Sequence, residues 1–133
     1  MIKILAIDDD VDLLNIYKEA LHPLGCQIDT AEDAVSAITQ YHKVQPNLIL
    51  LDVKMPAGGG LKVFDQLRAS FGSPVPIIFI TATARRELGT ILKLHKVFYL
   101  QKPFTRKQLL AKIKESLFGK TNPPPPPPPP AAG

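Results

Sequence analysis

Five short apolar runs recur along the chain, and segments with helical spacing lie between them. The runs cover residues 2–7, 26–30, 47–51, 76–80 and 97–100. Apolar residues are nearly continuous within these runs, as is typical of parallel strands that are buried on both faces. Strands that alternate with helices predict an α/β fold in which helices cover both faces of a parallel sheet, and right-handed crossovers leave few ways to connect it.

The segments between the runs carry apolar side chains at helical spacing. Leu109, Ile113 and Leu117 form one such stripe. The weakest helical segment is 84–94, because Gly89 within it disfavours a helix. We therefore expect a helix there that is short or mobile.

The length of 133 residues fits one domain with one core, and the prolines mark its end. Eight of the 14 prolines form an unbroken run at 123–130. We predict a folded domain over residues 1–119 and a proline-rich linker or tail, extended or disordered, over residues 120–133. Such a run favours a polyproline II rod of about 25 Å. The rod serves either as a spacer that tethers a further module or as a ligand for a proline-binding partner.

Membrane insertion and secretion are not predicted. No stretch approaches the ~20 consecutive apolar residues of a transmembrane helix. The first four residues alternate like a strand rather than forming a signal peptide. The single cysteine, Cys26, excludes an internal disulfide. We expect a soluble, cytoplasmic protein without a membrane partner.

Polar side chains follow four of the five apolar runs within one to three residues. In open α/β sheets ligands bind beyond the carboxyl ends of the strands, so these residues should share one edge. They are Asp8, Asp9 and Asp10 after the first run, Asp52 after the third, Thr81 after the fourth and Lys102 after the fifth. Carboxylates at this density repel each other unless a cation lies among them, and their hard oxygens suit Mg²⁺.

A metal that is only partly coordinated by protein invites a phosphate group. Lys102 would then supply a positive charge to one phosphoryl oxygen, and Thr81 a hydroxyl to another. Asp52 is the candidate nucleophile, since a carboxylate in this setting can form an acyl phosphate. Each residue alone has an ordinary interpretation as a helix cap, a strand-end hydroxyl or a surface charge. The combination, in this order along the chain, favours phosphoryl chemistry.

Four motifs resemble the receiver domain of bacterial two-component response regulators, the family of the chemotaxis response regulator. The resemblance extends over residues 1 to about 119. The motifs are Ile-Leu-Ala-Ile-Asp-Asp-Asp at 4–10, Leu-Leu-Asp-Val-Lys-Met-Pro at 50–56, Ile-Thr-Ala at 80–82 and Tyr-Leu-Gln-Lys-Pro-Phe at 99–104.

This resemblance implies a fold, a set of site residues and a class of partner. The fold is flavodoxin-like and doubly wound: a five-stranded parallel sheet of order 2-1-3-4-5, flanked by five helices. Mg²⁺ is implied as the cofactor, and the donor of the phosphoryl group is implied to be a histidine kinase or a histidine phosphotransfer protein. The implied roles are Asp52 as phosphoacceptor, Asp8, Asp9, Asp52 and the backbone carbonyl of Lys54 as metal ligands, Thr81 and Lys102 as contacts to the phosphoryl oxygens, Thr81 and Tyr99 as switch residues, and Pro103 as the residue after a cis peptide bond.

Three other functional classes compete with a phosphorylation-controlled switch. An aspartate-nucleophile phosphatase typically carries a second aspartate two residues after its nucleophile, where this chain has Lys54. A flavin or nucleotide binder is disfavoured because three aspartates, not a glycine- or hydroxyl-rich phosphate loop, follow the first run. A pseudo-receiver that binds partners without phosphorylation is the main alternative, against which the complete set of site residues argues. We expect no enzyme activity beyond self-phosphorylation from small donors and autodephosphorylation.

Charge is unevenly distributed along the chain. Residues 1–53 carry 3 basic and 9 acidic side chains, a net −6, whereas residues 54–133 carry 13 and 3, a net +10. Residues 85–120 hold 10 bases and 2 acids, and in the family this stretch builds the output face of the fourth helix, fifth strand and fifth helix. The stretch is either an ordinary solvated basic face or a surface that favours acidic partners, and we expect a downstream output domain or protein to act through this face. Nucleic acid would be attracted only nonspecifically, because no DNA-binding motif is present.

One departure from the family pattern concerns the loop after the nucleophile. Many receivers have an acidic residue and a glycine after Met-Pro, where this chain has Ala-Gly-Gly-Gly at 57–60. Because glycine has the most backbone freedom to lose, we expect this loop to be unusually free and costly to order.

Overall fold

A computed structural model describes residues 1–55, 59–70 and 74–119 of the chain. The predicted tail at 120–133 lies outside the described residues, as do Pro56 to Gly58 of the glycine-rich loop. The division into a domain at 1–119 and a tail therefore stays a prediction. Within the described ranges, no helix is both long enough and apolar enough to cross a membrane.

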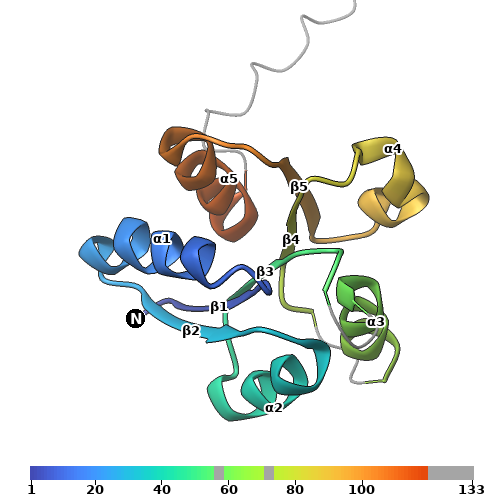
Figure 1. Ribbon diagram of the computed structural model, residues 1–133, viewed down its shortest axis with the longest axis horizontal. Coiled ribbons are helices and arrows are strands. Elements are labelled where there is room, and N and C mark those ends of the chain that lie inside the picture. The colour runs from blue at the N-terminus through green and yellow to red at the C-terminus, as the bar shows by residue number, and fades with distance from the viewer. Residues whose placement is uncertain (56–58, 71–73, 120–133) are drawn as a thin grey trace, which may run out of the picture.

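Five strands alternate with five helices, as the apolar runs predict (Figure 1). Short 3-10 turns follow α1 and α4, and π-helical residues continue α3 to Ser70. In chain order the elements are β1 (Lys3–Ile7), α1 (Val11–Leu21), β2 (Gln27–Ala31), α2 (Ala34–Val44), β3 (Leu48–Leu51), α3 (Gly59–Asp65), β4 (Ile77–Thr81), α4 (Arg85–Leu88), β5 (Val97–Gln101) and α5 (Arg106–Phe118).

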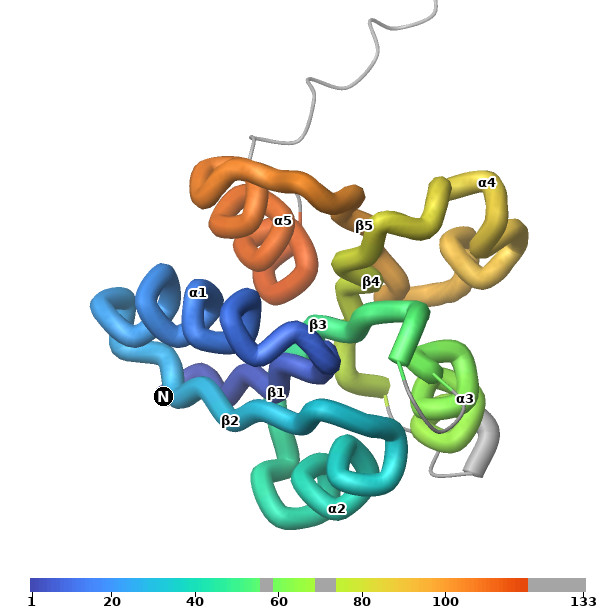
Figure 2. The backbone as a smooth tube through the Cα atoms, in the orientation of Figure 1, coloured from blue at the N-terminus to red at the C-terminus, as the bar shows by residue number. Residues whose placement is uncertain are grey.

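The strands form one parallel sheet in the order β2-β1-β3-β4-β5, which confirms the predicted topology. Strand order reverses between β1 and β3, which are neighbours inside the sheet (Figure 2). Because all strands are parallel, the carboxyl ends of β1 and β3 lie next to each other. The register pairs Ile7 with Leu51, so Asp8 and Asp52 each follow a paired residue. The backbone N–H of Asp52 donates to Ile7 O at 3.0 Å, which ties the two strand ends together.

Helices cover both faces of this sheet, which explains why the strand sequences do not alternate. One core cluster joins α1 and α5 to Ile4 and Ala6, and the other joins α2, α3 and α4 to Leu5 and Ile7. Successive residues of β1 therefore point into different hydrophobic layers. This burial fixes the register of the strands, and with it the positions of the polar residues at their ends.

The helix expected at 84–94 is short. Regular α-helix covers only Arg85–Leu88, and a 3-10 turn continues to Lys93. Gly89 lies at the junction with φ 59° and ψ −135°, a conformation that a residue with a side chain rarely adopts. The prediction of a short helix is confirmed, and its cause is the glycine.

Candidate functional site

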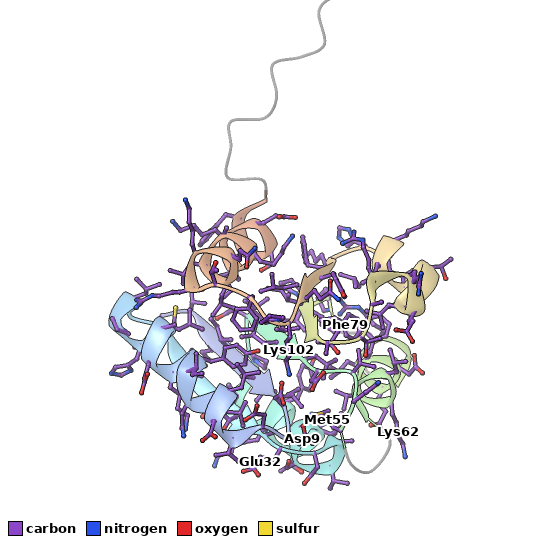
Figure 3. All side chains as sticks on the ribbon, turned by 45° about the horizontal axis from the view of Figure 1, so that its top comes forward. Asp9, Glu32, Met55, Lys62, Phe79 and Lys102 are labelled. Carbon is purple, nitrogen blue, oxygen red and sulfur yellow. The ribbon has the colours of Figure 1, made fainter. Side chains whose placement is uncertain are left out.

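Three carboxylates meet at the carboxyl edge of the sheet. Oxygens of Asp8, Asp9 and Asp52 all lie within 4.8 Å of one another. Asp8 and Asp52 are buried, with relative exposures of 1% and 7%, whereas Asp9 is exposed. Figure 3 places Asp9 and Lys102 at the same edge, with Met55 of the loop after β3 beside them. The sequence reasoning had assigned these residues to one edge, and the structure confirms it.

The three consecutive aspartates occupy different environments. Asp8 continues the ladder between β1 and β2, because its N–H donates to Ala31 O at 3.1 Å. Its Oδ1 accepts a bond of 2.9 Å from the N–H of Asp10. Asp10 is the N-cap of α1, and its Oδ1 accepts from the N–H of Leu13 at 3.2 Å. Asp10 therefore has a structural role, and Asp8 and Asp9 remain to bind a cation.

Lys102 lies between the two buried carboxylates. Its Nζ is 2.7 Å from Asp8 Oδ2 and 3.3 Å from Asp52 Oδ2. The backbone N–H of Lys102 donates to Thr81 O at 2.9 Å, and the following bond to Pro103 is cis, as expected. The ammonium therefore acts as the counter-ion of both carboxylates.

These contacts shift the proton affinities of the site. Burial raises the pKa of Asp8 above its ordinary value, and the hydrogen bond from Lys102 offsets this only in part. Burial is also the largest single influence on the pKa of Lys102, and it acts downward. The bonds to Asp8 and Asp52 outweigh it and leave the pKa of Lys102 raised. The excess of buried negative charge thus stabilises a proton or a cation at this edge.

The donor set fits a magnesium ion. Carboxylate oxygens are the hard ligands that Mg²⁺ prefers, and Asp8, Asp9 and Asp52 each offer one in the same small region. A single ammonium does not balance three carboxylates, so a divalent cation is favoured there. Lys54, the fourth ligand implied by the resemblance, is described in the loop after β3 with an exposed side chain. Its carbonyl as a ligand stays a prediction.

Thr81 and Tyr99 are linked through the backbone of Thr83. Thr81, at the end of β4, is 1% exposed, and its Oγ1 accepts from the N–H of Thr83 at 3.1 Å. The Tyr99 hydroxyl donates to Thr83 O at 2.6 Å. The guanidinium of Arg85 lies over the Tyr99 ring, 5.4 Å from its centre. A displacement of Thr81 would therefore shift the backbone of Thr83, and with it the hydrogen bond that holds the Tyr99 hydroxyl.

We expect substitution by valine to change the free energy of unfolding differently at Thr81 and at Thr83. Thr83 Oγ1 is buried without a hydrogen-bond partner in the described part of the chain. Thr83→Val should therefore leave the free energy of unfolding unchanged or raise it by about 1 kcal/mol, because a desolvated hydroxyl is removed. Thr81→Val should lower it by about 1–3 kcal/mol, because the buried N–H of Thr83 loses its acceptor. Urea unfolding of the two variants tests this, and equal losses would contradict it.

Gly59 and Gly60 lie against the backbone of Asp52 and Val53. The expectation of a free loop is wrong for Gly59 and Gly60, which are buried at the start of α3. A Cβ on Gly60 would lie 1.8 Å from Asp52 O, and one on Gly59 would lie 2.6 Å from Val53 O. The absence of a side chain lets α3 approach the backbone of Asp52, and the N–H of Gly60 donates to Val53 O at 2.8 Å. The signal available in the sequence was a glycine pair directly before a helical stripe, where good helix formers are usual.

Comparison with known proteins decides the family. The family model of the response regulator receiver domain matches residues 4–114. The chain belongs to this family. The receiver motifs, the sheet order and the carboxylate cluster all agree with that assignment.

Curated relatives of this receiver domain are longer proteins. A probable transcriptional regulator ycf27 from Cyanophora paradoxa is 38% identical over 124 residues, which is 91% of this chain and 50% of that protein. The response regulator MprA from Mycobacterium leprae is 36% identical over 124 residues, or 91% of this chain and 53% of that protein. The chain thus spans about half the length of such relatives.

Solved structures share the receiver fold over most of this chain. The response regulator TrrA from Thermotoga maritima, in complex with Mg²⁺ and BeF, has a TM-score of 0.77 at 30% identity and covers 88% of this chain and 100% of its own. The chemotaxis protein CheY4 from Vibrio cholerae has a TM-score of 0.79 at 27% identity and covers 88% and 99%. The chain is therefore a receiver domain of two-component signalling systems.

Proposed function

We propose that this receiver accepts a phosphoryl group on Asp52 from a phosphohistidine of a histidine kinase or a histidine phosphotransfer protein. The observation that carries the proposal is the placement of Asp52: its carboxylate is buried beside Asp8 and Asp9, with Lys102 Nζ 3.3 Å away. Aspartate-nucleophile phosphatases need an acid or base two residues later, and Lys54 cannot take that role. The domain thus acts as a switch whose own Asp52 receives the phosphoryl group, and not as a phosphatase that acts on other molecules.

The residues of the site divide the work of phosphoryl transfer. An Asp52 oxygen bonds to phosphorus while the bond between phosphorus and the donor imidazole nitrogen breaks, and the imidazole leaves with the electron pair. Asp52 is held in place by the N–H of Val53, which donates to its Oδ1 at 2.7 Å. Mg²⁺, held by Asp8, Asp9, Asp52 and the carbonyl of Lys54, would neutralise phosphoryl charge when bound.

Lys102 and Thr81 act on the transferred group. The Lys102 ammonium already faces Asp52 and can pair with a phosphoryl oxygen once that oxygen replaces the carboxylate charge. Thr81 Oγ1 accepts from Thr83, so its own hydrogen is free to be donated to another phosphoryl oxygen.

Phosphorylation with a small donor tests this proposal. The protein is incubated with acetyl phosphate and Mg²⁺, beside the Asp52→Asn variant, and intact mass is measured. We expect one added phosphoryl group on the wild type and none on the variant, because an amide is not a competent nucleophile. A wild type that gains no mass would support the pseudo-receiver alternative, and a variant that gains mass would place the phosphoryl group elsewhere.

We further propose that phosphorylation is transmitted to Tyr99. Movement of Thr81 toward the phosphoryl group shifts Thr83, whose carbonyl holds the Tyr99 hydroxyl, and the surface of α4, β5 and α5 repacks in response. The Thermotoga TrrA structure, a complex with Mg²⁺ and BeF, supports beryllofluoride as a stand-in for the phosphoryl group. Adding both to this protein should shift the amide resonances of residues 97–101. Unchanged shifts there, with shifts at Asp52, would disprove the connection.

The distribution of charge supports the face of α4, β5 and α5 as the output surface. Residues 85–120 carry 10 basic side chains and 2 acidic ones, and acidic Glu87 is engaged in the cap of α4, where its Oε2 accepts from the N–H of Ala84 at 3.1 Å. A downstream output domain or protein with acidic character suits this face. The relatives are named as transcriptional regulators, yet no specific nucleic-acid contact is proposed for this domain. A cytoplasmic setting and a spacer role for residues 120–133 stay predictions.

A further inference from the structure

Helix α5 lies at the surface of the domain (Figure 1). Its Leu109 and Ile113 are buried, and a cationic and apolar strip on another side of the helix is exposed. Residues 107, 111, 114 and 118 follow helical spacing and share one face. Phe118 is 69% exposed, Ala111 is exposed and Leu110 is half-buried. We name this surface the α5 strip: Arg106, Lys107, Leu110, Ala111, Lys114 and Phe118.

Part of the strip lines a hollow in the surface. Its first five residues line a shallow hollow of ≈ 640 Å³, with Leu110 and Ala111 as the apolar floor and three cations around them. An exposed aromatic side chain at the end of the same face extends the apolar surface. Apolar contact in the centre with charge at the rim is the usual anatomy of a protein interface.

The cations of the strip form no ion pair with a carboxylate in the part of the chain that the structure describes. The one acidic residue of α5, Glu115, pairs with Lys112 at 3.3 Å. Across residues 1–55, 59–70 and 74–119, no carboxylate forms an ion pair with Arg106, Lys107 or Lys114. Their charge is therefore available to a partner and repels another cationic surface.

A second copy of the chain does not fit the strip. A two-fold interface places the same patch on both subunits, so it would bring these unpaired cations face to face. Nucleic acid would use the charges and leave the apolar floor uncovered, since phosphate contacts come from polar groups. A bilayer needs several large apolar side chains on one face, and in the strip Phe118 alone is both large and well exposed.

We infer that the α5 strip binds an acidic amphipathic segment of a partner protein, in which carboxylates flank one or two large apolar side chains. Carboxylates pair with the three cations, and the apolar side chains cover Leu110, Ala111 and Phe118. This inference rests on the proposed role of the basic face in output, and it narrows that face to one side of one helix. The strip is exposed in the structure described, so binding does not require a phosphoryl group.

Fluorescence anisotropy with a defined peptide tests the inference. The probe is a labelled helical peptide of about 14 residues, long enough at ~1.5 Å per residue to span the strip, with Leu on one face and Glu beside it. Lys107→Glu combined with Lys114→Glu should weaken binding about tenfold or more and flatten its salt dependence. The control, Lys18→Glu with Lys43→Glu, changes net charge equally at exposed sites on α1 and α2 and should have little effect. Phe118→Ser should weaken binding without changing its salt dependence.

Several results would overturn the inference. These are no binding by the wild type, equal weakening by the two double variants, or equal binding of a peptide in which Gln replaces every Glu. Tighter binding of duplex DNA or of phosphatidylserine vesicles, lost in the Lys107 and Lys114 variant, would assign the strip to those ligands instead. Asp52→Asn separates this inference from the proposed function. Peptide binding should be unchanged in that variant, whereas phosphorylation should be lost.

Discussion

Gly60→Ala should be among the most destabilising single-methyl substitutions in this chain, lowering the free energy of unfolding by about 3 kcal/mol or more. The added Cβ would lie 1.8 Å from Asp52 O and 2.8 Å from Asp52 C, and both are backbone atoms that no side-chain rotation can clear. Helix propensity alone predicts the opposite sign, a gain of about 1 kcal/mol for alanine over glycine. The sign of the measured change in the free energy of unfolding therefore shows whether helix propensity or the contact with Asp52 dominates at this position. Urea unfolding gives the free energy.

The matched control is Gly25→Ala. Gly25 has a φ of 83°, and a Cβ there meets nothing within 4 Å. Only the left-handed backbone resists a side chain at this position, so the expected loss is about 1 kcal/mol. Gly60→Ala should also reduce phosphorylation of Asp52, since α3 would push on the residue that carries the carboxylate. A Gly60→Ala protein as stable as the wild type would contradict the close approach of α3.

Lys102→Met should lower the free energy of unfolding by about 2 kcal/mol in metal-free buffer at neutral pH. The ammonium lies 2.7 Å from Asp8 Oδ2 and 3.3 Å from Asp52 Oδ2, and both carboxylates are buried. Methionine keeps much of the side-chain volume and leaves the two carboxylates without a counter-ion. Saturating Mg²⁺ should recover most of the loss, because the metal replaces the missing charge. The same substitution should reduce phosphorylation, since a contact to the phosphoryl group is lost.

Two further comparisons sharpen this test. Burial already raises the pKa of Asp8 above 3.8, so the native state binds a proton more tightly than the unfolded chain. That effect alone makes stability rise as pH falls toward the Asp8 pKa, and Lys102→Met should steepen the rise. Lys112→Met removes a lysine whose Nζ lies 3.3 Å from Glu115 Oε1 in a more exposed setting, and it should cost under 1 kcal/mol. A loss in Lys102→Met that Mg²⁺ leaves untouched would show that packing, not charge, is the cause.

The sequence predicted the sheet and the residues at its edge because both follow from local patterns. Apolar runs locate β1 and β3, and any polar residue directly after them must lie at the carboxyl edge of a parallel sheet. Asp8 and Asp52 were found in this way, and their register with Ile7 and Leu51 brings them together. The shortness of α4 was also predictable, because Gly89 is a local signal that disfavours a helix, whereas the 3-10 turn after it was not predicted.

Contacts between distant segments were not predictable. The buried position of Gly60 depends on how closely α3 approaches the strand end, and the sequence shows only glycines, which indicate freedom as readily as tight packing. The bond from Tyr99 to the carbonyl of Thr83 joins residues 16 apart through an atom that every residue possesses. The unpaired hydroxyl of Thr83 and the charges left unpaired on α5 likewise appear only when the three-dimensional neighbours are known.

The connection between Thr81 and Tyr99 runs through main-chain atoms of Thr83, its N–H on one side and its carbonyl on the other. Any amino acid except proline supplies both atoms, so the identity of residue 83 can change without breaking the connection. In the proposed mechanism, a substitution at residue 83 would therefore change the chemistry beside the phosphoryl group and leave this hydrogen-bonded connection in place. Under that proposal, the lifetime of the phosphorylated state and the transmission of the signal would be adjustable independently of each other within one short loop.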